Sequence, residues 1–69
     1  MGEITFKFLS MRKPSTYQFE SLDEALTTIE ELIQKPDRAY LLISPIKWKR
    51  SIEQFLENQS ANVRVKARQ

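Results

Sequence analysis

Few residues in this sequence could carry catalytic chemistry. The chain of 69 residues contains neither histidine nor cysteine, so zinc binding by imidazole or thiolate and the common nucleophile–base pairs are excluded. Two pairs of adjacent carboxylates, Asp23–Glu24 and Glu30–Glu31, lie in a predicted helix, where neighbours point about 100° apart and cannot flank one substrate bond. The single glycine, Gly2, leaves no glycine-rich phosphate loop. We therefore expect a protein that is not an enzyme and that uses no metal or cofactor.

A first basic cluster surrounds the only tryptophan. Lys47, Lys49 and Arg50 crowd the predicted start of a helix, where the helix dipole favours acidic residues by about 0.3–1 kcal/mol each. Local conflicts of this kind often mark functional positions, and an acidic partner would relieve this one. The alternative is that Trp48 belongs to a core-facing stripe with Ile52 and that the cations are merely solvated.

A second basic cluster lies in residues 62–68, which alternate between apolar and cationic side chains. Arg64, Lys66 and Arg68 share one side of a predicted strand, and a period of two places them on the face that points away from the core. An open cationic sheet face is a geometry that single-stranded nucleic-acid binders use. The alternative is that the charges protect an exposed sheet edge from aggregation.

The elements that position these clusters follow from the spacing of apolar residues. Residues 3–9 and 16–20 alternate like strands and are joined by a basic loop that contains Pro14. Ser21 and Glu24 form a capping box for a helix over residues 22–34. Lys35 follows at the C-terminal end, where the helix dipole favours a positive charge, and Pro36 lies beyond it. Residues 39–43 are apolar without alternation, as expected of a strand at the sheet centre.

The second helix has two interpretations. In the first, Ser44 is the N-cap, Pro45 is the first helical residue, and the helix continues to Asn58. In the second, residues 46–50 form a short strand and Ser51 caps a shorter helix. Residues 62–68 form the last strand in both.

These elements predict an α/β (α+β) fold of one small domain over residues 1–69. The order strand-strand-helix-strand-helix-strand closes naturally as a two-layer sandwich, a four-stranded mixed sheet with both helices on one face. Lys7 and Gln18 should share the open face with the cations of residues 64–68, and Tyr40 is a candidate for stacking there.

Composition sets the class of protein and of partner. Hydrophobic residues make up 41% and charged residues 29% of the chain, so we expect a folded, soluble domain. The sequence shows no signal-peptide pattern and no apolar run long enough to cross a bilayer, which predicts a cytoplasmic protein without membrane contact. A core this small usually needs a disulfide, a metal or a partner subunit. With the first two excluded, a homodimer through an edge strand or through the apolar side of Trp48 is expected.

The sequence thus predicts a small protein-binding or regulatory module whose partner is another protein with an acidic surface. The alternative is a nucleic-acid-binding accessory protein that uses the basic sheet face and the basic helix start. The candidate partner-binding residues are the same in both cases: Lys47, Trp48, Lys49, Arg50, Arg64, Lys66 and Arg68.

Overall fold

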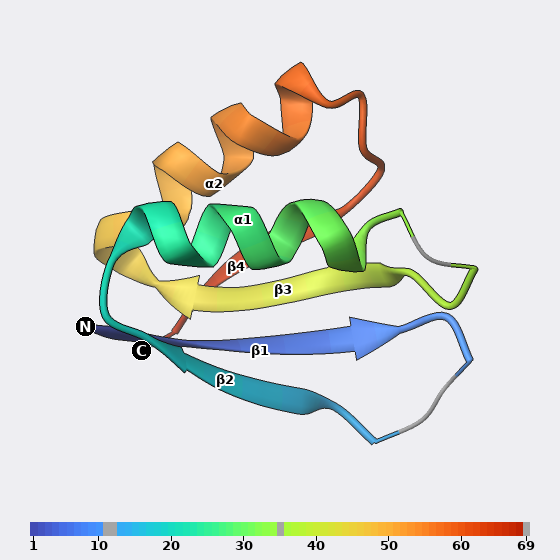
Figure 1. Cartoon of the computed structure of the whole chain (residues 1–69), viewed down its shortest axis with the longest axis horizontal. Coiled ribbons are helices and arrows are strands. Elements are labelled where there is room, and N and C mark those ends of the chain that lie inside the picture. Colours follow the sequence, from blue (N-terminus) through green and yellow to red (C-terminus); the bar gives the residue numbers. More distant parts are fainter. Residues whose placement is uncertain (11–12, 35, 69) are drawn as a thin grey trace.

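The computed structural model describes residues 1–10, 13–34 and 36–68. These residues form four strands and two helices in the predicted order (Figure 1). The elements are β1 Gly2–Phe8, β2 Ser15–Phe19, α1 Leu22–Leu32, β3 Ala39–Pro45, α2 Ile46–Asn58 and β4 Arg64–Arg68. Their ends differ from the prediction by one or two residues, as is usual at frayed boundaries. Part of the predicted basic loop, residues 11–12, and Lys35 lie outside the described ranges.

The sheet is four-stranded and mixed, as predicted, with the order β2-β1-β3-β4. β1 is antiparallel to β2 and β3, whereas β3 and β4 are parallel. The two crossover connections, β2–α1–β3 and β3–α2–β4, place both helices on the same face of the sheet (Figure 1). No described element covers the opposite face, which we call the open face.

One hydrophobic core fills the space between the sheet and the helices. Side chains at alternate positions of β1, Ile4 and Phe6, are fully buried there, as the period of two requires. The other buried apolar residues come from every remaining element except β4: Phe19, Ala25, Ile29, Leu32, Ala39, Leu42, Trp48, Ile52 and Leu56. β4 contributes Val65, which is half-buried against this core.

Helix α1 begins at the predicted capping residue. The Glu24 amide donates to Ser21 Oγ at 3.3 Å, and Ser21 has the extended backbone of an N-cap. Asp23 and Glu24 occupy the first turn, which agrees with the helix dipole. The helix ends at Leu32, two residues before the predicted end, because Ile33 is the C-cap and Gln34 donates in a tighter turn to the Glu31 carbonyl oxygen.

Helix α2 begins one residue later than predicted, and its cap is different. Ser44 is not the N-cap but the penultimate residue of β3, where it pairs with Ala67 of β4. Its buried hydroxyl donates to the Pro45 carbonyl oxygen at 3.2 Å. This pairing keeps the chain extended as far as Pro45, whose φ of −58° and ψ of 144° are not helical.

The alternative strand over residues 46–50 is wrong. Ile46–Asn58 is one continuous helix with Ser51 inside it. Trp48, Ile52 and Leu56 are all buried, and in the helix their spacing of four residues places them along the face that covers the sheet. Burial of this stripe therefore decided between two patterns that were locally similar.

The only glycine lies where Trp48 leaves no room for a side chain. A Cβ atom placed on Gly2 would lie 2.6 Å from the Cη2 and Cζ3 atoms of Trp48 and 2.9 Å from Cγ of Pro45. Gly2 pairs with Phe19 at the start of the hairpin. Glycine is thus required here by close approach of the indole ring and not by a backbone turn.

Candidate functional site

The open face carries the second basic cluster, as the sequence predicts. The strand registers place Thr5 beside Ile43, Lys7 beside Leu41, and these two β3 residues beside Lys66 and Arg64. Gln18 pairs with Glu3 on the same face. The predicted grouping of Lys7 and Gln18 with the β4 cations is therefore confirmed.

Arg68 is engaged within the sheet. Its Nη2 atom donates to Thr5 Oγ1 at 2.8 Å, and its Nη1 atom lies 3.5 Å from Glu3 Oε1. Because β3 separates β4 from β1, the guanidinium reaches across a whole strand. Thr5 in turn shares a 3.1 Å hydrogen bond with Thr16 of β2. Arg68 therefore connects β4 to β1 directly and to β2 through Thr5, and sequence spacing could not reveal these partners.

Arg64 and Lys66 remain as exposed cations at the edge of this face. Neither makes an ion pair with any residue in the described ranges. Their register neighbours, Leu41 and Ile43, are only half-buried. The combination is an apolar strip bordered by a cationic edge, and we call Leu41, Ile43, Arg64 and Lys66 the β4-side patch.

The apolar half of this patch was missed in the sequence analysis, although a signal for it exists. Residues 39–43 are apolar without alternation, so a strand built from them presents apolar side chains on both faces. Both helices were predicted on one face. Leu41 and Ile43 then had to lie on a face that nothing covers.

Tyr40 lies at a β-bulge rather than in the regular ladder. Phe8 pairs with Ala39 and Lys7 with Leu41, so β3 has one residue more than β1 at this point. The Tyr40 side chain is 43% exposed. The other exposed tyrosine, Tyr17, stacks edge-on against the core residue Phe6 with 5.4 Å between ring centroids.

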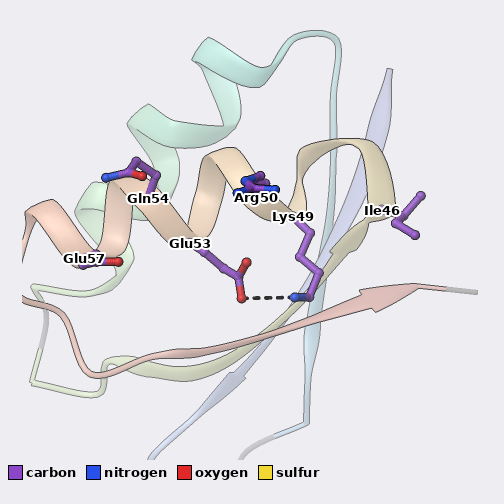
Figure 2. A pocket seen from close by; sticks show the side chains of 6 residues that line it. All are labelled: Ile46, Lys49, Arg50, Glu53, Gln54 and Glu57. Carbon is purple, nitrogen blue, oxygen red and sulfur yellow. Dashed lines mark hydrogen bonds and ion pairs between the residues drawn. The ribbon is translucent and has the colours of Figure 1, made fainter.

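The first basic cluster lies in the first turn of α2, as predicted, but most of it has internal partners. Lys49 Nζ lies 3.1 Å from Glu53 Oε2 (Figure 2), and Lys47 Nζ lies 5.6 Å from the centre of the Trp48 ring. Trp48 itself is 8% exposed and packs in the core. Arg50 is exposed, and the described residues provide it with no ion pair.

The two basic clusters do not form one surface. α2 belongs to the helix layer (Figure 1). Arg64 and Lys66 alternate along β4 with the core-facing Val65 and therefore lie on the open face. The sequence-predicted residues therefore divide into two groups. The group on β4 adjoins the half-buried Leu41 and Ile43, and the group on α2 adjoins the exposed Ile46.

A depression lies along α2, lined by Ile46, Lys49, Arg50, Glu53, Gln54 and Glu57 (Figure 2). Its side chains are charged or polar except for Ile46, which is 75% exposed. A second groove lies between α2 and β4. Its apolar lining residues are Leu56, Ala61, Val63 and Val65, and its polar ones are Glu53, Glu57, Asn62 and Arg64.

Other kinds of site find little support in the described part of the chain. Residues 1–10, 13–34 and 36–68 contain no group of three or more Asp or Glu side chains placed to hold a metal ion. Neither α1 nor α2 is long and apolar enough to cross a membrane.

Comparison with known protein families finds no family model that matches this chain. Comparison with curated proteins and with solved structures finds no similar chain in either set. Function is therefore inferred from the chain's own residues.

Proposed function

We propose that this domain is a non-enzymatic protein-binding module and that the β4-side patch contacts an acidic partner surface. The observation that carries the proposal is the strip of half-buried Leu41 and Ile43 beside Arg64 and Lys66, two cations without an ion pair among the described residues. Apolar contacts supply affinity, while charges at the rim select a partner of opposite sign and accelerate encounter. We place the module in the cytoplasm, where proteins without disulfides are the rule.

Nucleic-acid binding is the second candidate, favoured by the excess of cations on the open face. Lys7, Arg64, Lys66 and Arg68 lie there with a single acid, Glu3. Single-strand binders, however, stack bases on aromatic rings, and the centre of this face holds Leu41 and Ile43 instead. The balance of side chains favours a protein partner.

Affinity capture from native lysate with three baits tests the proposal. The baits are the wild type, Arg64→Glu/Lys66→Glu, and the control Lys47→Glu/Arg50→Glu, which changes the net charge equally on the helix layer. We expect a captured protein that resists nuclease treatment, is lost with the first variant and is retained with the control. Capture that survives Arg64→Glu/Lys66→Glu would contradict the proposal.

Fluorescence anisotropy separates the two candidates. Labelled single-stranded and duplex oligonucleotides should show no binding to the wild type at physiological salt. Nucleic acid would be favoured instead by binding that persists there and whose affinity falls, for each tenfold rise in salt, by about 0.7–0.9 logarithmic units per phosphate contact.

A further inference from the structure

β4 is an edge strand that pairs only with β3 among the described residues. An edge strand turns the N–H and C=O groups of every second residue away from its sheet, where another extended segment can bind them. The strand that carries these cations therefore also presents backbone groups that have no strand partner among the described residues.

A groove on the helix-covered side continues this edge. Leu56, Ala61, Val63 and Val65 give it an apolar floor between α2 and β4. A strand added beside β4 would direct every second side chain into this groove and the alternate ones onto the open face.

The two sides of β4 differ in charge and in polarity. Arg64 and Lys66 border the added strand on the open face. The groove on the other side has an apolar floor, and its charged lining residues are Glu53, which is paired with Lys49, together with Glu57 and Arg64. Opposite charges across neighbouring strands stabilise pairing and like charges oppose it. Acidic side chains are thus favoured on the open face and apolar ones in the groove, which selects one of the two orientations of an alternating segment.

A second copy of β4 fits this edge poorly. Antiparallel pairing about a two-fold axis normal to the sheet would bring Arg64 and Lys66 of both copies onto one face, and like charges there oppose the pairing. Charge complementarity points to a different occupant.

We propose that β4 binds an extended segment of a partner protein as a fifth strand, and that this segment alternates acidic with apolar residues. Its acidic side chains face Arg64 and Lys66, and its apolar side chains enter the groove formed by Leu56, Ala61, Val63 and Val65. This inference rests on the proposed function and adds to it the conformation and the sequence pattern of the partner.

Selection of displayed random peptides of about ten residues, long enough to span β4, tests the pattern. The immobilised wild-type protein is the target, and enriched peptides should alternate acidic and apolar residues. Arg64→Glu/Lys66→Glu should weaken the best peptide about tenfold or more, whereas the control Lys47→Glu/Arg50→Glu should leave its affinity unchanged. Enriched peptides without a period of two would overturn the inference.

N-methylation of the best peptide tests the backbone contacts. A strand at a sheet edge uses every second amide, so methylating one alternate set should weaken binding about tenfold or more, and methylating the other set should not. Equal effects of the two sets would refute strand addition. If methylation of the two sets had equal effects but binding still depended on Arg64 and Lys66, strand addition would be refuted and the proposed protein-binding function would stand. If peptide binding were unaffected by substitution of both cations, both proposals would be contradicted.

Discussion

At the residue scale, Gly2 shows how one small position supports the packing of Trp48. The indole ring occupies the space that any other side chain at position 2 would need. We predict that Gly2→Ala lowers the free energy of unfolding by about 1–3 kcal/mol, the usual cost of overpacking a core. Denaturant titration measures this loss. In the double variant Gly2→Ala/Trp48→Phe, the smaller ring should remove part of the clash, so strictly additive losses would contradict the contact.

Arg64 and Arg68 are both arginines on β4, but their surroundings differ. Arg68 bonds Thr5 and Glu3 across β3, whereas Arg64 has no ion pair or side-chain hydrogen bond within the ranges that the structure describes. Arg68→Gln should lower the free energy of unfolding by about 0.5–1 kcal/mol, because this ion pair is partly exposed. Arg64→Gln, the matched control, should change it by less than about 0.5 kcal/mol. Thermal unfolding of the two variants compares them directly, and equal stabilities would show that the Arg68 contacts contribute nothing.

At the scale of elements, the start of α1 depends on a side-chain cap. Ser21→Ala removes the acceptor of the Glu24 amide and should lower the free energy of unfolding by about 0.5–2 kcal/mol. Ser51→Ala is the control, because Ser51 lies on an exposed position inside α2 where alanine favours the helix. A larger loss of unfolding free energy for Ser51→Ala than for Ser21→Ala would favour the alternative in which Ser51 caps a shorter second helix.

At the scale of the whole molecule, self-association remains a prediction, and the structure favours the β2 edge of the sheet as its interface. Trp48 is buried and β4 carries cations, whereas β2 is an edge strand, Ser15–Phe19, without a charged residue. Uncharged edges are prone to pairing with another copy. We expect sedimentation at increasing concentration to show association of the wild type that is weakened by Gln18→Lys. A wild type that stays monomeric at high concentration, or association indifferent to Gln18→Lys, would exclude β2 as the interface.

Apart from residues 44–51, where two interpretations stayed open, the sequence by itself determined the elements, their order and the face that each presents. Alternation in residues 3–9 and 62–68, the Ser21 cap and the helical stripe of residues 22–34 are local signals, because each depends on residues a few positions apart. The mixed sheet with helices on one face followed from them through the general rules of chain connection.

Only the tertiary structure decided which polar side chains have hydrogen-bond or ion-pair partners within the fold, and where helix α2 begins. Arg68 meets Thr5, and Trp48 meets Gly2, across most of the chain length, and no local pattern encodes such pairs. Ser44 has the residue type of a cap, yet its ladder with Ala67 holds it in β3, because tertiary pairing outweighs a local preference worth about 1 kcal/mol. The strand registers likewise place Leu41 and Ile43 beside Arg64 and Lys66, and the proposed partner surface rests on this placement, which no local pattern gives.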